Sequence, residues 1–513
     1  MKLFSKYFFI GLFALFVYSV SAQNVVGYCG TQSSPISDAQ LDANLAYLAI
    51  HKDELKVRQV RYVPVRFIIV QTAAGKGGIN VKSAFRMLCK LNDEYANQNI
   101  QFYMKDDFKY LNNDLVNSDP QSQGAGNIMK NVKDKNALNF FFTADIKSDN
   151  PGSVLGFYSP EHDIMVIKNV EATYESQTAP HELGHFFSLR HTFYGWECQP
   201  WNMADHGKVV TFTVAPCYGA QVELVNGSNC TTAADKVCDT PPDYNFGFGW
   251  PNDCRDFNVD VYDKNNELIR PSQNNYMSYF FGCTGYHFTQ GQKDVIWADL
   301  NSAKRNYLKS TYTPPATTVS NDIEYQLPAD GQDVVKTEPI LLQWTPVPNA
   351  TFYIVEYSRK KGFDSNVTVT EVVKTNQYTI PASYFPSGLA TGYWRVTAMN
   401  EYAICNVQTN PPMSFNLVNV VSNKVLTEVK SWQVNPNVVT SGHLFQLNID
   451  INKKSDMELS IINSAGLISH HQKLSFNIGK QSIEIKSVKL VPGTYLVVLK
   501  SDTGMESRKL IIQ

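Results

Sequence analysis

The segment that most constrains this chain is the run H-E-L-G-H at 181–185, with a further histidine, His191, after five more residues. On an α-helix His181 and His185 lie one turn apart on the same face, so their two imidazoles can bind one metal ion. Glu182 then lies beside the metal, where a carboxylate can accept a proton from a bound water. The run therefore predicts a zinc-dependent hydrolase with His181, His185 and His191 as ligands and Glu182 as general base.

This segment resembles the metzincin pattern H-E-x-x-H-x-x-G-x-x-H, whose members carry a methionine turn beneath the metal. A candidate for that turn is Met277, in the run N-Y-M-S-Y at 275–279, about ninety residues downstream. Two further runs, C-D-T-P-P at 238–242 and F-T-Q-G-Q at 288–292, make the chain similar to the pappalysin family. The resemblance implies a zinc endopeptidase in which Met277 is structural and Tyr279 stabilises the transition state.

The chain departs from this family at Ser188, where glycine is usual. For His191 to become a ligand, the chain must leave the helix after Phe187 and turn sharply near Ser188. Glycine takes such a turn without a Cβ penalty, whereas serine costs roughly 1 kcal/mol. Because a zinc bond can offset that cost, we expect His191 to be the third ligand.

The pattern of elements predicts an α+β metzincin catalytic domain over residues 62–310, with a mixed sheet, a zinc helix and an irregular, disulfide-held lower subdomain. Strands are expected at 63–71, 100–104, 137–142 and 162–168, and helices at 81–98 and 290–308, the latter capped by Thr289. We expect the strand 162–168 to be the sheet edge above the cleft, where an extended substrate would add its backbone.

Six cysteines gather after the zinc helix, and in an exported protein they predict disulfides that hold a loop-rich region together. Six cysteines allow fifteen pairings, and the alternative is that some are free buried thiols. The resemblance to pappalysins implies one pair, Cys254 with Cys283. The six are Cys198, Cys217, Cys230, Cys238, Cys254 and Cys283.

Cys29 stands apart, before Gly30 and close to the N-terminus. Latent metzincins often carry such a cysteine, whose thiolate occupies the open zinc position until a prosegment is removed. We expect residues 23–61 to be that prosegment, with a trypsin-like cut in the run R-Q-V-R at 58–61. The alternative is a disulfide between Cys29 and Cys89 or Cys405.

Residues 1–22 read as a signal peptide, with a basic start, an apolar stretch and a small-residue cleavage site at Val20-Ser21-Ala22. No later segment is apolar enough to cross a membrane, so we expect an exported protein without an integral membrane segment in its mature form. The net charge of -2 is spread without runs and does not favour nucleic acid or an anionic membrane as partner.

Two all-β sandwich domains are expected to follow a linker at 311–321. Residues 322–420 resemble a fibronectin type III module, with alternating strands around Trp344, Tyr353 and Trp394. Residues 425–513 resemble the C-terminal sorting domain of the type IX secretion system, which implies a secreted or cell-surface bacterial protein and the outer-membrane secretion machinery as a partner. The alternative for this last part is a second immunoglobulin-like domain.

These features together predict a secreted zinc endopeptidase, made as a zymogen, that acts on protein or peptide substrates. The resemblance also implies structural Ca²⁺, whose ligands the sequence does not place. One alternative is a surface adhesin or scaffold in which a decayed metzincin domain only binds. The other is a zinc hydrolase that acts on a glycan or an amide.

Overall fold

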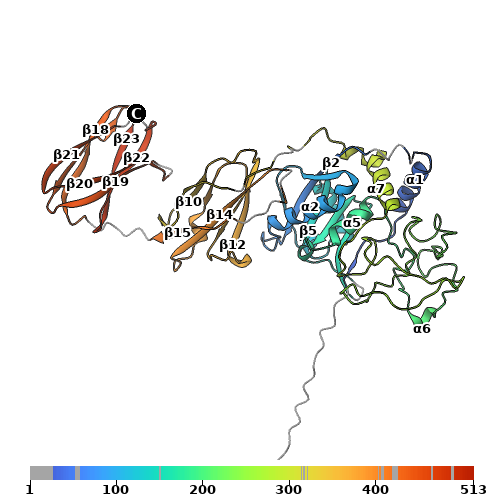
Figure 1. Cartoon of the computed structure of the whole chain (residues 1–513). Helices are drawn as coiled ribbons and strands as arrows, with labels where there is room; N and C mark the ends of the chain where they lie inside the picture. The colour runs from blue at the N-terminus through green and yellow to red at the C-terminus, as the bar shows by residue number, and fades with distance from the viewer. Residues whose placement is uncertain are drawn as a thin grey trace, which may run out of the picture. The chain divides into compact units, whose positions relative to one another are not determined.

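The computed structural model divides the chain into two compact units, Met1–Ala316 with Glu401–Cys405 and Thr317–Asn400 with Asn406–Gln513 (Figure 1). The structure describes residues 27–51, 53, 58–148, 152–313, 315, 318–320, 322–401, 404–405, 410–418, 426–463, 466–486 and 490–513. The predicted signal peptide, 1–22, and parts of the predicted prosegment and linker lie outside these residues.

The first unit is a mixed α/β structure built on one seven-stranded sheet. Its helices are α1 (Pro35–His51), α2 (Val81–Tyr95), α3 (Asp114–Ser118), α4 (Gln123–Val132), α5 (Thr178–Phe186), α6 (Met203–His206) and α7 (Gln290–Asn301). Its strands are β1 (Gly27–Cys29), β2 (Arg61–Gln71), β3 (Ile100–Met104), β4 (Lys109–Asn112), β5 (Leu138–Thr143), β6 (Ser153–Ser159) and β7 (Ile164–Lys168).

The sheet has the order β1-β6-β7-β5-β2-β3, with β4 also beside β2. Strands β2, β3, β4, β5 and β7 are parallel, whereas β6 is antiparallel to β7. β2 reads as an almost continuous apolar run because both of its faces are covered. Ile68 packs in a buried cluster with Met129 of α4, and Phe67, which points to the other face, packs on Phe108 beside Phe85 of α2.

The expectation that the strand at 162–168 forms the sheet edge is wrong. That strand is β7, and it lies between β5 and β6. The strand on the other side of β7 is β6, which the sequence pattern did not reveal because Gly156 interrupts its apolar run. β1 then pairs in parallel with the outer side of β6, with Gly27 opposite Ser153 and Tyr28 opposite Val154. The N-terminal segment therefore occupies the position at which a strand can be added.

The region between α6 and α7 contains only isolated β-bridges. Disulfides join Cys198 to Cys217, Cys230 to Cys238 and Cys254 to Cys283, so the six clustered cysteines pair among themselves. Cys89 of α2 is bonded to Cys405, which leaves Cys29 free and removes the alternative disulfide for Cys29. Covalent closure of short loops replaces the regular backbone ladder as the source of order in this region.

In the N-terminal segment, helix α1 and residues 58–61 both contact the rest of the first unit. α1 packs beside α7, as Figure 1 also shows. The Arg58 side chain is 12% exposed and pairs with Asp294 at 2.5 Å, and Arg61 is the first residue of β2. The trypsin-like cut expected at 58–61 therefore falls where the Arg58 side chain forms an ion pair and Arg61 already belongs to strand β2.

The second unit is all-β and contains two pairs of sheets. The first pair comprises β8 (Tyr325–Leu327), β9 (Gln332–Val335), β10 (Ile340–Trp344), β11 (Phe352–Ser358), β12 (Thr368–Val373), β13 (Gln377–Ile380), β14 (Thr391–Met399) and β15 (Met413–Val418). The second comprises β16 (Val429–Asn435), β17 (Val438–Val439), β18 (Leu444–Ile451), β19 (Ser455–Asn463), β20 (Ile468–Phe476), β21 (Gly479–Lys486), β22 (Gly493–Lys500) and β23 (Met505–Ile512).

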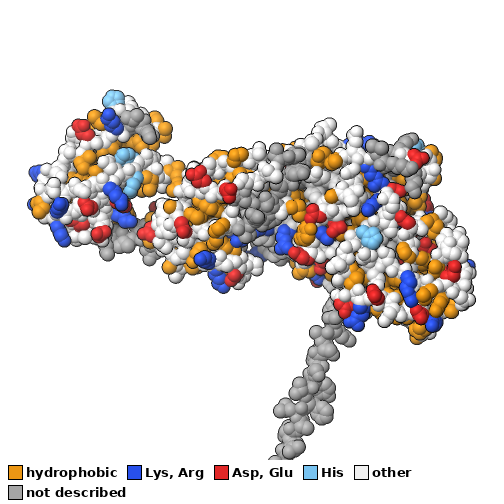
Figure 2. Space-filling view, in the orientation of Figure 1, with side chains coloured by type: hydrophobic (Ala, Val, Ile, Leu, Met, Phe, Trp, Pro, Cys, Tyr) orange, Lys and Arg blue, Asp and Glu red, His pale blue; other side chains and the backbone are white. Residues whose placement is uncertain are grey.

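Each pair encloses its own apolar core. Trp344 and Trp394 are fully buried in the first pair, and their rings lie 6.5 Å apart. In the second pair Leu447 of β18 and Leu459 of β19 belong to one buried cluster. Lys, Arg, Asp and Glu side chains are interspersed over the face that Figure 2 shows, in keeping with the formal net charge of -2.

Candidate metal centre

The helix α5 carries the first two histidines, and every one of its residues is buried. It ends at Phe186, and the chain reverses at Ser188, whose φ is +66°. The Leu189 amide donates to the Gly184 carbonyl at 3.0 Å, which closes this turn. The departure at Ser188 therefore does not prevent the turn, and His191 comes back to the helix.

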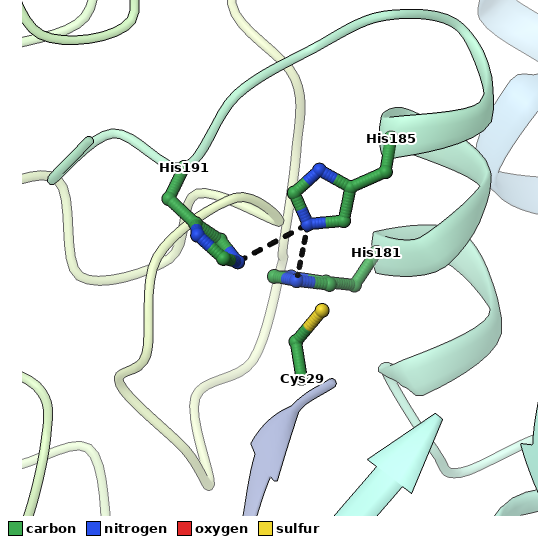
Figure 3. A group of neighbouring side chains, drawn as sticks. All are labelled: Cys29, His181, His185 and His191. Carbon is green, nitrogen blue, oxygen red and sulfur yellow. Dashed lines mark hydrogen bonds between the residues drawn. The ribbon is translucent and has the colours of Figure 1, made fainter. Parts of the chain in front are cut away.

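The three imidazoles converge through their Nε2 atoms, as Figure 3 shows. His185 Nε2 lies 3.2 Å from His181 Nε2 and 3.1 Å from His191 Nε2. A tetrahedral zinc with ligands at about 2.0–2.1 Å requires nitrogen atoms separated by roughly 3.3 Å. The spacing of the three nitrogen atoms is therefore close to that of a zinc ligand set.

The opposite ring nitrogens settle which tautomers are present. His181 Nδ1 lies 2.6 Å from the Tyr276 carbonyl, and His185 Nδ1 lies 2.8 Å from the Leu189 carbonyl. A carbonyl only accepts, so both Nδ1 atoms carry the proton and both Nε2 lone pairs face the centre. Burial, and then the neighbouring histidines, lower the pKa of His181 to about 3 and that of His185 well below its ordinary value. Neutral imidazoles with converging lone pairs fit a bound cation.

Glu197 orients the third imidazole, because His191 Nδ1 lies 3.2 Å from Glu197 Oε1. Its Oε2 accepts from the Gly195 amide at 2.8 Å, which holds the carboxylate in place. Sequence reasoning did not single out Glu197. The signal that could have found it is a carboxylate six residues after a metal-binding histidine, since such ligands usually donate their second nitrogen to an acceptor.

Cys29 lies at the open side of the three histidines (Figure 3). Its Sγ and the histidine nitrogens all lie within 4.8 Å of one another. Sγ also donates to Glu182 Oε2 at 3.3 Å, and burial, followed by the Glu182 charge, raises the pKa of the thiol well above its ordinary value. The structure thus brings Cys29 to the position that the prosegment interpretation requires.

Glu182 is fully buried next to the histidines. Thr31 Oγ1 donates to its Oε2 at 2.8 Å, while Oε1 has no protein partner. Burial raises the pKa of Glu182 to about 7. Gly156 makes room for this side chain, because a Cβ there would lie 3.2 Å from Glu182 Cγ and 2.8 Å from Thr178 Cγ2. Thr31 is a contact that sequence reasoning missed, although it follows Cys29 by only two residues.

Met277 lies directly against helix α5. A Cβ at Gly184 would come within 2.4 Å of Met277 Sδ, so glycine is needed there for the close approach. The Met277 amide donates to Asn275 Oδ1 at 2.8 Å, and the Thr192 amide donates to the Met277 carbonyl at 3.1 Å. These bonds tie the methionine turn to the segment that follows His191.

Tyr279 faces the centre from the same turn. Its ring centroid lies 5.0 Å from that of His191 and 6.0 Å from that of His181. Its hydroxyl accepts from the Cys29 amide at 3.1 Å and donates to the Cys29 carbonyl at 3.3 Å. Burial is the main cause that raises the pKa of Tyr279 well above its ordinary value, so the hydroxyl keeps its proton.

Two cavities adjoin this centre. The larger has a volume of 1790 Å³ and is lined by Cys29 and the residues that follow it, together with His191 and Tyr279. The smaller, of 310 Å³, lies beside His181 and Glu182 and is walled by Phe280, Phe281 and Tyr286. The N-terminal segment thus lines both cavities next to the three histidines.

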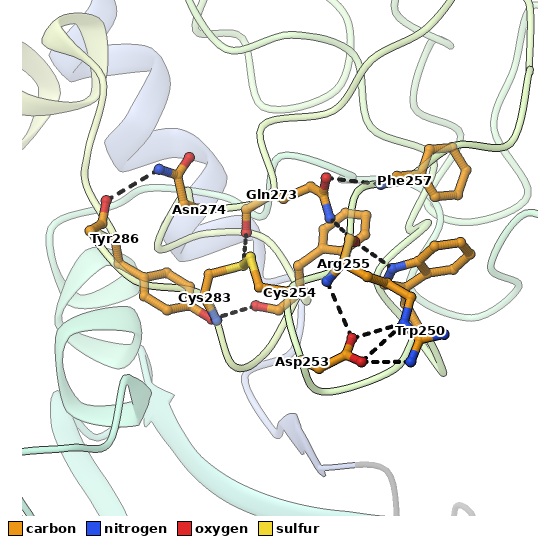
Figure 4. Close-up of a disulfide and its surroundings, with 11 residues drawn as sticks. Trp250, Asp253, Cys254, Arg255, Phe257, Gln273, Asn274, Cys283 and Tyr286 are labelled. Atoms are coloured by element: carbon orange, nitrogen blue, oxygen red, sulfur yellow. Dashed lines mark hydrogen bonds and ion pairs between the residues drawn. A yellow bond between two sulfur atoms is a disulfide. The ribbon is translucent and has the colours of Figure 1, made fainter.

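The disulfide of Cys254 and Cys283 braces the wall of the smaller cavity (Figure 4). Around it, the Gln273 side chain donates to the Arg255 carbonyl at 2.9 Å and accepts from the Phe257 amide at 2.9 Å. The Cys254–Cys283 pair is the one that the pappalysin resemblance implies, and the segment that it closes contains Met277 and Tyr279.

Three buried acidic residues gather in the irregular region. Burial, and then the charges of Asp235 and Asp243, raise the pKa of Glu223. Glu223 Oε2 has no protein partner, whereas Asp235 accepts from Thr240 Oγ1 at 3.0 Å and Asp243 accepts from Ser278 Oγ at 2.8 Å. An orphaned, buried carboxylate oxygen beside other carboxylates fits a hard cation with oxygen ligands.

Comparison with known proteins finds one family model, that of the secretion system C-terminal sorting domain, which matches residues 444–513. No curated protein matches the chain. Among solved structures, a mutant of promirolysin from Tannerella forsythia is 15% identical, with a TM-score of 0.33, over 54% of this chain and 96% of that one. The FN1–FN3 domains of chicken CNTN1 are 13% identical, with a TM-score of 0.19, over 39% of this chain and 66% of that one.

The sorting domain indicates that the protein is secreted and attached at the cell surface. Among the helices of the described residues, none is both long and apolar enough to cross a membrane. The prediction of a secreted or cell-surface protein is thereby confirmed.

Proposed function

We propose that the protein is a zinc-dependent endopeptidase, secreted in a latent form. The observation that carries this proposal is the convergence of three histidine Nε2 atoms, with separations of 3.1 and 3.2 Å from His185 Nε2, beside a buried carboxylate, Glu182. His181, His185 and His191 would hold the metal, and Zn²⁺ is the ion that three imidazoles with one open position favour. Zinc bound there supplies Lewis acidity, which polarises a peptide carbonyl and acidifies a water.

The protein groups around the centre have distinct tasks in peptide hydrolysis. The Tyr276 and Leu189 carbonyls and Glu197 orient the three rings. Glu182 accepts the proton of the attacking water and delivers it to the leaving amine. Tyr279, with its hydroxyl protonated, donates to the carbonyl oxygen as negative charge develops there.

An extended peptide is the substrate that the sheet favours. The outer edge of β6 already accepts one added strand, β1, and backbone pairing of that kind binds a peptide without regard to most of its side chains. A substrate would take this edge once β1 leaves. This arrangement supports a peptidase over a hydrolase of glycans or small amides.

Latency follows from what the N-terminal segment covers. Cys29 would supply the fourth ligand, Thr31 engages the carboxylate of the general base, and β1 blocks the edge of β6. Each of these contacts must break before a water and a substrate can enter. The adhesin alternative is motivated by Ser188 and by the β-rich C-terminal half. Because the turn at Ser188 still returns His191 to the centre, Ser188 gives that alternative no support.

We also propose that the expected calcium binds at Glu223 and Asp235, two buried carboxylates whose charges interact in the irregular region. Calcium bound to these oxygens would relieve their mutual repulsion and stabilise the loops that carry the disulfides. Added Ca²⁺ should raise the unfolding temperature of the full chain, and Glu223→Gln should abolish that rise. An equal rise in wild type and variant would exclude this placement.

Glu182→Gln is the direct test of the peptidase. We expect the full chain to bind one zinc whether or not Glu182 is changed, because the three imidazoles are intact. After removal of the N-terminal segment, the variant should cleave denatured casein at least about a hundredfold more slowly than the wild type, since it lacks the base. Metal analysis and casein hydrolysis measure the two quantities.

A matched control for this test is His185→Ala, which should lose zinc and activity together. Chelation of the wild type should reproduce that loss, and zinc should restore activity to the chelated protein alone. Casein cleavage by Glu182→Gln at the wild-type rate would refute the mechanism, and absence of zinc from the wild type would refute the metal centre.

A further inference from the structure

Helix α1 presents one buried face to the rest of the first unit. Leu41, Asn44 and Leu48 are spaced along that face and are 0%, 3% and 9% exposed, whereas Ile50, on the opposite side, is 79% exposed. The two leucines are ordinary core residues at helical spacing. A buried asparagine between them is unusual, because its amide must find partners inside the protein.

Asn44 finds those partners on two segments that support the metal centre. Its Nδ2 donates to Ser188 Oγ at 2.8 Å and to Asp299 Oδ2 at 3.0 Å. Ser188 is the positive-φ residue of the turn that leads to His191. Asp299 of α7 is fully buried and also binds Arg305 at 2.7 Å, and Arg305 in turn donates to the carbonyl of Phe186, the last residue of α5.

This contact accounts for a serine where glycine would be easier. Glycine takes a positive φ more easily than serine, because it has no Cβ. The Ser188 hydroxyl accepts one of the two hydrogen bonds that the Asn44 amide donates, and glycine could not provide that acceptor. The serine therefore helps to hold α1 against the turn between His185 and His191.

Charge pairs extend the same contact past His191. Asp38 of α1 binds the Arg190 guanidinium at 2.5 Å, and Arg190 lies 4.0 Å over the Tyr194 ring. Tyr194 shares a hydrogen bond of 2.7 Å with Ser33, just before α1. Asp42, one turn further along α1, pairs with Lys236. Because Asp38 and Asp42 are four residues apart, they lie on one side of α1, next to its buried face, and each pairs there with a basic side chain.

We propose that Ser188, Arg190, Lys236 and Asp299 form a docking surface for helix α1, which keeps the N-terminal segment bound and the centre closed without help from the Cys29 thiol. The surface is separate from the metal, because it contacts the turn between His185 and His191 from behind. This inference deepens the proposed function and rests on it for the meaning of latency. A single cut between α1 and Arg58 then leaves a bound fragment, and activation requires the loss of α1 itself.

The test nicks the full chain and follows the fragment. Residues 54–57 are replaced by the site of a specific protease, in a Glu182→Gln background that prevents self-cleavage. After the cut, gel filtration and mass spectrometry measure how fast the N-terminal fragment leaves. Cys29→Ser should change the rate of release less than threefold, whereas Asn44→Leu, which keeps the volume but loses both donated bonds, should raise it at least about tenfold.

Two further variants keep the test decisive if Asn44→Leu folds poorly. Asp38→Asn keeps the shape of the side chain and removes its charge, so release should become faster and less sensitive to salt. Ile50→Ala changes an exposed side chain of the same helix and should leave the rate unchanged. Release from Cys29→Ser as fast as from Asn44→Leu, or no effect of Asn44→Leu and Asp38→Asn, would overturn the proposal.

The readout is the mass of a complex and does not depend on peptidase activity. If Asn44→Leu speeds release of the fragment but the casein test fails, the docking surface is supported and the proposed function is refuted. If casein is cleaved but only Cys29→Ser speeds release, the proposed function is supported and the docking surface is refuted.

Discussion

At the scale of single residues, the chemistry of the centre depends on groups that orient rather than react. His181 and His185 can present lone pairs to one point because the Tyr276 and Leu189 carbonyls hold their other nitrogens. Glycine at 184 lets Met277 approach the helix, and glycine at 156 leaves space for Glu182. Small changes at these positions would disturb the centre although none of them touches a substrate.

Tyr279→Phe separates the packing of this residue from its chemistry. The phenylalanine ring can keep its contacts with His191 and Phe193, so zinc content should not change. Loss of the hydroxyl should lower kcat by roughly a hundredfold and alter KM little, because the donor acts on charge that develops in the transition state. Steady-state kinetics on the enzyme freed of its N-terminal segment measure both constants.

Phe193→Leu is a control for that variant, since it changes a neighbour of the Tyr279 ring without removing a donor. A fall in zinc content of Tyr279→Phe, or an unchanged kcat, would contradict the assigned role. The first result would mean that the hydroxyl is structural, and the second that the oxyanion has another donor.

At the scale of elements, several hydrogen bonds to one carboxylate can join segments that are not paired as neighbouring strands. In the C-terminal sandwich Glu428, just before β16, collects the hydroxyls of four residues from three separate segments. Its Oε1 accepts from Ser501 at 2.6 Å and from Ser455 at 3.3 Å, and its Oε2 accepts from Thr503 and from Thr427 at 3.1 Å. A single carboxylate thus joins β16 to the turn after β22 and to the start of β19.

The hydrogen bonds of the Glu428 carboxylate predict how the second unit responds to acid. Burial opposes ionisation, but the hydroxyl donors outweigh it and lower the pKa of Glu428 to about 2. A lowered pKa stabilises the fold above the unfolded range of about 4.3, and this stability is lost as the pH falls toward 2. Glu428→Gln should therefore lower the unfolding temperature at neutral pH and make it less dependent on pH between those limits.

Calorimetry of the full chain at several pH values measures this effect, and the transition of the first unit serves as an internal reference. Glu506→Gln, on β23, is a matched control that leaves the hydrogen bonds of Glu428 intact. An acid response of Glu428→Gln as steep as that of the wild type would show that another group titrates.

At the scale of the whole molecule, the chain combines a centre for chemistry with a domain for export. The sorting domain at 444–513 indicates secretion and surface attachment, and the disulfides are of the kind that an oxidising compartment permits. The latent peptidase that we propose would be compatible with this route, because its centre would stay covered during export.

Deletion of the C-terminal sandwich, residues 426–513, should stop the protein from reaching the cell surface and leave it inside the outer membrane. The first unit has its own sheet and core, so the truncated protein should keep its zinc. Cell fractionation with metal analysis of the retained protein measures both outcomes. Surface display of the truncated chain at the wild-type level would contradict the export role of this domain.

The local pattern of the chain was enough to predict the helix that carries His181 and His185, and the four strands expected at 63–71, 100–104, 137–142 and 162–168. Such patterns, histidines one turn apart or runs of apolar residues, depend on neighbours along the chain. The assignment of Cys29 as a fourth ligand came from the family resemblance and stays a prediction. The pairing of Cys254 with Cys283 came from a family likeness, and the structure also forms it.

Tertiary structure alone decided the contacts between residues far apart in the chain. The place of β6 between β1 and β7 depends on which strands pair, and the partners of Asn44 lie 144 and 255 residues away, at Ser188 and Asp299. Glu197 was missed for the same reason, because its contact depends on the direction of the His191 ring. A sequence determines which residues can ligate, cap or pack, but only the folded chain brings helix α1 to the turn between His185 and His191.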